Sequence, residues 1–274
     1  MSQTTKRICL VEFPLICGFF LAGFSILVQG CTTRVEGCLD IAAANFEFTA
    51  DRPCNDCCTY PVLSVSLSQK WNDRNFSTDS TLSDRNGHLY RISDLKYFLS
   101  SWSWKGEGQL VYTVDSSELT CGTGKLHFTP DILVVDSRQF QYVLGTIRES
   151  PMVDTLMLRL GLSSDLDCLD PSASETPSIL SDKGILWDDS TKSLATIRLV
   201  LQKDTSQEIF DTLLVHFSND ISLPYELNFT PGISTMLKLT VDYAKWFSGV
   251  DILDPMSIRS SLELGVGSSF SKTE

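Results

Sequence analysis

Apolar and polar side chains alternate along much of the chain after residue 60. The alternation is clear in residues 64–68, 156–161, 197–202 and 236–241. Successive side chains of a β-strand point to opposite faces, so each run predicts a half-buried strand. Further strand candidates are Leu89–Ile92, Lys96–Trp104, Gln109–Val114, Ile132–Val135, Phe140–Ile147, Glu208–Phe217 and Tyr225–Phe229.

Turn-forming residues separate several of these runs, as at Asn86-Gly87 and Thr230-Pro231-Gly232. Many short strands and few helical runs predict an all-β domain, an antiparallel β-sandwich, over residues 61–254. Val241–Phe247 fits a short helix or a strand end. Ser163–Asp189 is acidic and rich in Ser and Pro, as in an ordered loop or flap. Residues 255–274 are rich in Ser and Gly, so we expect a flexible tail there.

The N-terminus has the pattern of a secretory leader over residues 1–30. Lys6 and Arg7 precede an apolar run from Phe13 to Val28. This run is shorter than the roughly 20 residues of a membrane-spanning helix, and small residues follow it, as in a signal peptide. An uncleaved membrane anchor is the alternative.

The leader ends in Val28-Gln29-Gly30-Cys31, which resembles the bacterial lipobox. In that motif the Cys is lipidated and becomes the new N-terminus. The resemblance implies an anchor at Cys31 and a place in the cell envelope, on the outer membrane, facing the periplasm or the surface. Several acyl chains on one residue would hold the protein to a membrane stably.

Nine Cys occur, and those outside the leader and Cys31 form an even set. An even count in an exported protein predicts disulfides, although the sequence does not fix their pairing. The tight Cys54-Asn55-Asp56-Cys57-Cys58 cluster could alternatively form a metal knuckle, but no second pair follows at zinc-site spacing. We therefore expect residues 31–60 to form a small Cys-rich module that depends on its crosslinks for stability. The disulfide candidates are Cys38, Cys54, Cys57, Cys58, Cys121 and Cys168.

The formal charge of −12 becomes −13 once Lys6, Arg7 and Glu12 leave with the leader. Such an acidic chain argues against nucleic acid as a partner. The sequence has no Gly-x-Ser-x-Gly elbow, no His-Glu-x-x-His helix and no phosphate-binding Gly loop. We therefore expect a binding protein and no enzyme.

An ordered series of strand motifs resembles the MbnP-like family. Asn86–Ile92 leads into Leu95-Lys96-Tyr97-Phe98-Leu99-Ser100, and Leu133–Asp136 and Leu156–Leu162 follow. Gly184-Ile185-Leu186-Trp187 and the His-bearing Leu214–Phe217 complete the series, which spans about residues 62–250.

The resemblance implies an exported copper-binding β-sandwich, often beside a dihaem peroxidase-like partner, with an oxidised Trp among the metal ligands of some members. On this basis the candidate metal residues are His216, His88 and Trp187. The sequence departs from the family where Asp188-Asp189 follows Trp187 and where Lys70-Trp71 replaces a His-bearing stretch.

Only three His are present, and imidazole is a favoured copper ligand. His216 is the leading candidate, whereas His88 follows a turn and His127 lies in a short strand pattern. Each could instead be an ordinary strand or surface His, and Trp187 an ordinary packing residue.

Calcium is a second metal to consider, because it takes oxygen ligands. The acidic group Asp165, Asp167 and Asp170 has a suitable spacing, although a solvated loop explains it as well. Asp40, Asn45 and Asp51 offer another set. Trp102 and Trp104 share one strand face and are either core residues or an exposed platform for glycans. The alternative function is accordingly a cell-surface glycan- or protein-binding sandwich without metal.

Overall fold

The structure is a computed structural model that describes residues 34–106, 108–113, 117–121, 124–128, 131–149, 152–163, 166 and 186–273. For residues 117–121 and 124–128 only the backbone is described. The leader, Cys31, Cys168 and the acidic group at residues 165–170 lie outside these ranges, as do the side chains of Cys121 and His127.

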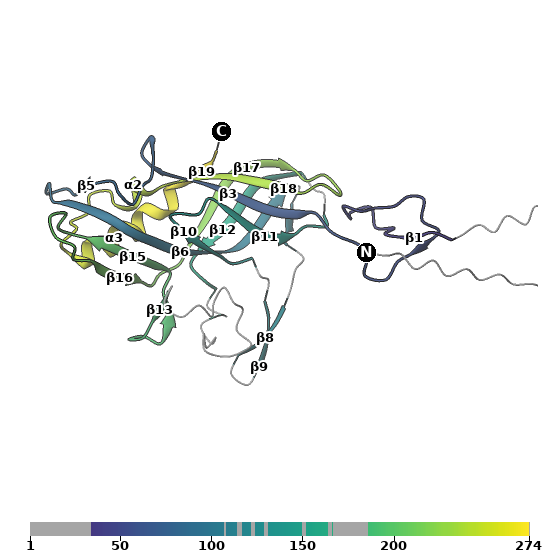
Figure 1. The fold of residues 1–274 in the computed structure, drawn as a ribbon, viewed down its shortest axis with the longest axis horizontal. Helices are drawn as coiled ribbons and strands as arrows, with labels where there is room; N and C mark the ends of the chain where they lie inside the picture. The colour runs from purple at the N-terminus through teal and green to yellow at the C-terminus, as the bar shows by residue number, and fades with distance from the viewer. Residues whose placement is uncertain are drawn as a thin grey trace, which may run out of the picture.

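Two sheets pack face to face, and the predicted all-β sandwich is confirmed (Figure 1). The larger sheet has the order β16-β15-β6-β12-β17, with β5, β7 and β10 also pairing with β6. Its strands are β5 (Leu82–Ser83), β6 (Leu89–Gly106), β7 (Gln109–Val111), β10 (Leu133–Asp136), β12 (Met152–Leu160), β15 (Ile197–Gln202), β16 (Asp211–Val215) and β17 (Asn219–Asn228).

The second sheet has the order β11-β3-β18-β19, with β4 beside β3. Its strands are β3 (Val62–Trp71), β4 (Arg74–Asn75), β11 (Gln141–Thr146), β18 (Thr235–Asp242) and β19 (Phe270–Lys272). Pairings between the described strands of the two large sheets are antiparallel except that of β3 with β18, which is parallel. Short hairpins extend from the sandwich: β8 (Ser117–Cys121) with β9 (Gly124–Phe128), and β13 (Trp187–Asp188) with β14 (Ser193–Leu194).

Strand β6 is one continuous strand, although the sequence suggested two. The pairing of β6 with β15 shifts register near Ile92, and the pairing with β12 shifts near Ser101, which has a φ of 55°. Such bulges bend a strand without ending it, because only one residue leaves the ladder. Long β6 can therefore pair with several partners and serve as the central strand of the larger sheet.

The core fills the space between the sheets with alternate side chains of each strand, as the period-two pattern predicts. Trp102 and Trp104 are fully buried in it, which rules out the exposed aromatic platform. A buried polar chain crosses the core: the Tyr97 and Tyr243 hydroxyls lie 3.2 Å apart, and Tyr243 donates to Gln69 Oε1 at 2.8 Å.

The C-terminal segment is ordered, and the prediction of a flexible tail at 255–274 was wrong. Helix α3 (Pro255–Gly265) starts behind Asp254, whose side chain caps the Met256 amide, and Pro255 occupies the first turn. These are ordinary helix-start signals. Ile258 and Leu262 are buried, and β19 then pairs with β18. The segment is rich in Ser and Gly, and for this reason the short amphipathic pattern of α3 was missed in the sequence.

The stretch Val241–Phe247, which fitted a short helix or a strand end, holds both: β18 ends at Asp242 and helix α2 spans Tyr243–Trp246. The 3₁₀ turn η2 (Val266–Ser268) follows α3. Trp246 donates its indole N–H to Ser269 Oγ at 2.7 Å, so the terminal segment closes over one end of the core. No helix among the described residues has the length and apolar content to cross a membrane.

The N-terminal module lies beyond one end of the sandwich and has its own small pair of strands (Figure 1). Strands β1 (Glu36–Gly37) and β2 (Arg52–Pro53) pair in parallel, and Cys38 is bonded to Cys58. The module joins the sandwich through Tyr60, whose ring lies 3.8 Å from the Arg148 guanidinium carbon.

Candidate metal site

His216 lies directly after strand β16, which ends at Val215. Thr196, just before β15, holds the residues on both sides of it. The Thr196 amide donates to the Val215 carbonyl at 2.8 Å, and the Thr196 hydroxyl bonds to the Phe217 backbone. The backbone around His216 is therefore fixed, so the direction of its side chain is set by the sheet and not by a mobile loop.

The imidazole of His216 meets the carboxylate of Asp188 from the β13–β14 hairpin. Nε2 of His216 lies 2.9 Å from Oδ2 of Asp188. The His216 side chain is 28% exposed and that of Asp188 15% exposed. Nδ1 of His216 has no hydrogen-bond partner within the described part of the chain.

Asp188 is held in place from its other oxygen. Oδ1 accepts from the amide of Ser190 at 2.9 Å and from its hydroxyl at 2.6 Å. The Ser190 hydroxyl and the His216 ring both stabilise the ionised carboxylate and lower the pKa of Asp188 well below its usual range. The pair therefore combines a charged carboxylate with an imidazole that this carboxylate orients.

A small hydrophobic cluster, separate from the main core, supports the hairpin. Leu186 is buried with Phe98, Ile132 and Leu166, and Leu194 packs against them. The Ala195 amide donates to the Leu186 carbonyl at 2.7 Å. Leu186 and Leu194 thus anchor the hairpin to the larger sheet, where they pack in one cluster with Phe98 of β6.

Trp187 lies one residue before Asp188 in β13 and is half-buried. Its side chain points to the opposite face of this short strand, because adjacent strand residues alternate. The indole N–H donates to Asp189 Oδ1 at 3.1 Å. Trp187 and Asp188, the partner of His216, therefore lie in the same hairpin. The indole N–H of Trp187 bonds to Asp189 and not to the His216 imidazole.

His88 lies at the far end of the larger sheet, so it cannot share an ion with His216. His88 immediately precedes β6, whereas Val215 lies opposite Ile197, which in turn pairs with Tyr97 further along β6. The strand between Leu89 and Tyr97 is roughly 25 Å long at the usual rise per residue. The side chain of His127 lies outside the described part of the structure, so the prediction for His127 is not tested.

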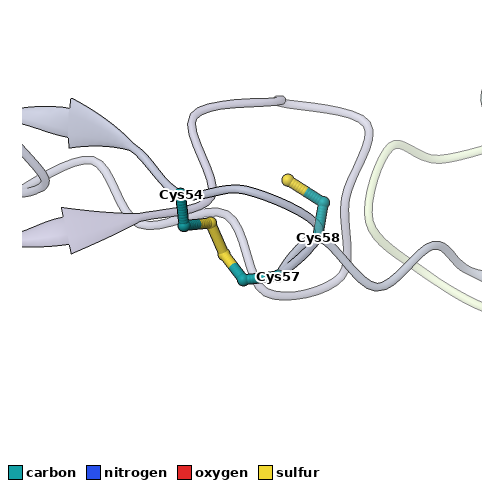
Figure 2. Close-up of side chains that lie close together, drawn as sticks. All are labelled: Cys54, Cys57 and Cys58. Carbon is teal, nitrogen blue, oxygen red and sulfur yellow. A yellow bond between two sulfur atoms is a disulfide. The ribbon is translucent and has the colours of Figure 1, made fainter. Parts of the chain in front are cut away.

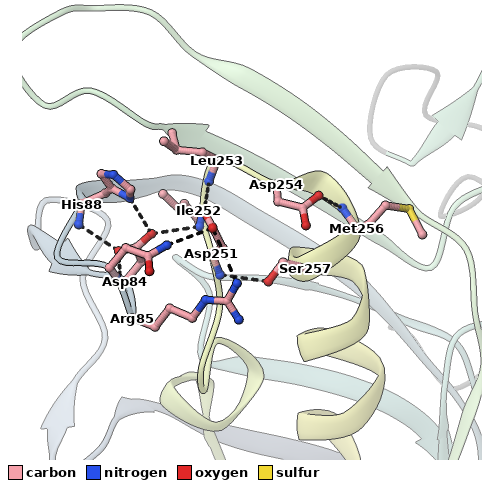
Figure 3. Close-up of polar contacts among 10 residues, drawn as sticks. Asp84, Arg85, His88, Asp251, Ile252, Leu253, Asp254, Met256 and Ser257 are labelled. Carbon is pink, nitrogen blue, oxygen red and sulfur yellow. Dashed lines mark hydrogen bonds and ion pairs between the residues drawn. The ribbon is translucent and has the colours of Figure 1, made fainter.

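His88 belongs to a saturated hydrogen-bond knot around the buried carboxylate of Asp84 (Figure 3). The amides of Asn86 and His88 donate to Oδ1, both at 2.8 Å. Oδ2 lies 3.0 Å from His88 Nδ1 and accepts from the Ile252 amide at 3.1 Å. Burial acts to raise the pKa of Asp84, but these bonds outweigh it and lower the pKa to about 2.

Asp251 completes a group with Asp84 and His88 whose ligand atoms lie within 4.8 Å of one another. Nδ2 of Asn86 donates to Asp251 Oδ2 at 2.9 Å, and an Arg85 guanidinium nitrogen lies 3.6 Å from the same oxygen. Hydrogen-bond donors thus already occupy both carboxylates. The knot ties the turn before β6 to the segment before α3, which is a structural role.

Four of the predicted disulfide cysteines pair within the N-terminal module, as Cys38–Cys58 and Cys54–Cys57. The sulfurs of Cys54, Cys57 and Cys58 lie within 4.8 Å of one another (Figure 2). The calcium candidates of the module are each used locally. Asp40 accepts from the Ala42 amide and the Tyr60 hydroxyl, Asn45 spans Cys57 and Thr59, and Asp51 accepts from the Val35 amide.

Sequence reasoning placed Asp188 at the end of the acidic Ser163–Asp189 stretch and missed its contact with His216. The only local signal was its position directly after Trp187. The contact joins residues 28 positions apart, and it depends on the hairpin folding back over the strand end. The prediction for His216 itself identified a residue that the fold does hold at a defined, partly exposed position.

The fold and the oriented pair define the class of protein: a β-sandwich with a carboxylate-bound imidazole at a strand end. Among protein families, the MbnP model matches residues 60–260. Among solved structures, the search finds "MbnP from Methylosinus trichosporium", with 10% sequence identity and a TM-score of 0.43, covering 69% of this chain and 78% of that one. No curated protein matches.

The family model covers most of the chain, so this protein belongs to the MbnP family. The resemblance of the strand motifs to that family is thereby confirmed.

Proposed function

We propose that this protein is an exported lipoprotein that binds copper and serves acquisition or handling of the metal. The observation that carries the proposal is the His216–Asp188 pair at 2.9 Å in a chain of the MbnP family. A metal-binding His commonly gives its second ring nitrogen to a carboxylate, which fixes the ring and raises its basicity. His216 has this arrangement, with Nδ1 as the coordinating atom.

The donor set fits copper, although the described residues supply only part of it. Imidazole suits copper in either common oxidation state. In this proposal His216 is the ligand, Asp188 positions it, and Trp187 on the same hairpin is the residue whose oxidised form would add a further donor. The proposed oxidant is a dihaem peroxidase-like partner, so this chain is a binding protein and not itself an enzyme.

Export and anchoring form the second part of the proposal. Two disulfides in the N-terminal module suit an oxidising compartment. The leader and the lipobox-like motif at Cys31 supply a route to the cell envelope and a lipid anchor. Wild-type protein should partition into the detergent phase after phase separation, and Cys31→Ser protein into the aqueous phase. Equal partitioning of the two would contradict the anchor.

Glycan binding loses the observation that favoured it, since Trp102 and Trp104 are core residues. Calcium binding keeps only the acidic group at residues 165–170, outside the described part.

The copper proposal is tested by metal content. Purified protein is loaded with copper at neutral pH, dialysed and measured by elemental analysis, beside His216→Ala and His88→Ala. We expect stoichiometric copper in the wild type and in His88→Ala, and loss of that copper in His216→Ala. Wild-type protein that retains no copper would contradict the proposal and leave only the fold.

A further inference from the structure

The N-terminal module holds a Cys-x-x-Cys pair next to a third sulfur. Cys54 and Cys57 are bonded to each other, and the Cys58 side chain lies beside that bond while pairing with Cys38 (Figure 2). Cys54, Cys57 and Cys58 are half-buried residues, and their sulfurs lie within 4.8 Å of one another. Soft ligands are therefore concentrated at one point of the module surface, far along the chain from His216.

Bonds other than the disulfide hold both ends of this pair. The Cys54 amide donates to the Gly37 carbonyl at 3.0 Å. Asn45 donates from Nδ2 to the Cys57 carbonyl at 2.8 Å, and its Oδ1 accepts from the Thr59 amide at 2.8 Å. The two cysteines would consequently stay close together if the bond between their sulfurs were opened.

The two disulfides of the module differ in what they contribute. Cys38–Cys58 closes a separation of 20 residues, and Cys38 is 1% exposed. Cys54–Cys57 closes a separation of only 3 residues, and both of its cysteines are half-buried, whereas Cys38 is buried. A short loop removes little entropy from the unfolded chain, so its disulfide contributes less to stability. Exposed disulfides are also the more easily reduced ones. Cys54–Cys57 should open first, with Cys38–Cys58 still holding the module.

We propose that Cys54–Cys57 is a reducible bond that covers a Cu(I) site. An external dithiol transfers two electrons and two protons to the disulfide and is itself oxidised to a disulfide. Cys54 and Cys57 become thiols, and one Cu(I) ion then displaces their two protons to form a bis-thiolate complex. Exchange with an external disulfide, which takes up two electrons and two protons and becomes a dithiol, re-forms the Cys54–Cys57 bond and releases the ion, so the redox state controls binding.

Cu(I) is favoured over zinc by the number of ligands. Structural zinc sites use about four protein ligands in a tetrahedron. Here only three sulfurs come together among the described His, Cys, Asp and Glu residues, and one of them is committed to Cys38. Thiolates suit Cu(I) as well as zinc, so the ligand number decides between them, and two thiolates are enough for Cu(I).

This inference deepens the proposed copper function, but it concerns a separate site. It is tested by Cu(I) titration of the full chain in mild detergent, without oxygen, against a chromophoric Cu(I) chelator. Each protein is measured as isolated and after treatment with limiting dithiothreitol followed by desalting. The proteins are the wild type, the double variant Cys54→Ser with Cys57→Ser, and His216→Ala.

Reduction should add about one equivalent of tightly bound Cu(I) to the wild type and none to the double variant. His216→Ala should keep this redox-dependent gain, whatever it loses elsewhere. A gain that persists in the double variant, no gain in the wild type, or an equal gain of Zn(II) would overturn the proposal. Copper that binds without reduction reports on His216. If His216→Ala loses only this copper, or if the wild type never binds it, the result concerns the His216 proposal alone, so the two proposals can fail separately.

Alkylation at increasing dithiothreitol, mapped by mass spectrometry, tests the order of reduction. Cys54 and Cys57 should be labelled at lower reductant than Cys38 and Cys58. Simultaneous labelling of all four would contradict a selectively opened pair.

Discussion

Two His–Asp pairs lie at different places on the same sheet, and their surroundings differ. At Asp84 every carboxylate lone pair faces an N–H group, and the pair joins two segments far apart in sequence. At Asp188 one neighbouring Ser and the imidazole hold the carboxylate, and each of the two imidazoles has a second nitrogen without a hydrogen-bond partner among the described residues. The Asp84 carboxylate therefore ties two chain segments together, whereas Asp188 bonds only within its own turn and to the imidazole that it orients.

Removal of the two carboxylates should show this difference most strongly in stability. Asp84→Ala leaves several buried N–H donors without partners, so we expect it to lower the free energy of unfolding by about 3 kcal/mol. Asp188→Ala removes a local turn and one contact, and should cost about 1 kcal/mol. Urea unfolding measures both. Similar losses for the two variants would contradict the distinction.

Acid should act mainly through the Asp84 knot. The folded-state pKa of Asp84 is about 2, below its ordinary value of 3.8. A lowered pKa contributes stability that is complete above the unfolded pKa and is lost as pH falls through the folded pKa. We expect about 2 kcal/mol to disappear between roughly pH 4 and pH 2. Urea unfolding at several pH values measures this loss.

Asp84→Asn is the control for the acid experiment, because Asn does not titrate. Its free energy of unfolding should be lower at neutral pH and flatter across the acid range. A wild-type slope that survives in Asp84→Asn would assign the acid loss to other carboxylates.

Copper affinity should depend on Asp188 and not on Asp84. Mutating a carboxylate that orients a metal-binding His changes the metal affinity by about 10-fold to 100-fold, so Asp188→Asn should weaken copper binding within that range. His88→Ala, which opens only the knot, should leave the affinity unchanged. Competition with a chelator at neutral pH measures the affinities, and urea unfolding confirms that both variants are folded. Unchanged affinity in Asp188→Asn would remove its positioning role.

The smallest effect belongs to Asp189, next to Asp188 in the hairpin. Asp189 accepts from the Trp187 indole and from Lys192 at the surface. Exposed contacts of this kind contribute little, so Asp189→Ala should change the free energy of unfolding by less than about 0.5 kcal/mol. A larger loss would mean that this contact holds the hairpin, in place of the Leu186 and Leu194 packing.

The sandwich could be predicted from sequence because the side chains of a strand alternate between its two faces. Most strands of this chain show the matching alternation of apolar and polar residues. The errors came where the period was absent or broken. Helix α3 is short and rich in Ser, and β6 continues through bulges that interrupt its alternation. His216 was found through resemblance. The Asp188 contact could not be found, since it depends on how a short hairpin folds over a strand end.

Copper bound through His216 is the central claim, and electron paramagnetic resonance of Cu(II)-loaded protein tests it most directly. An imidazole that coordinates through one nitrogen gives electron spin-echo modulation from its remote nitrogen. The wild type and His88→Ala should show this modulation, and His216→Ala should lack it. Modulation that remains in His216→Ala, or is missing from the wild type, would contradict the assignment of the metal to this strand end.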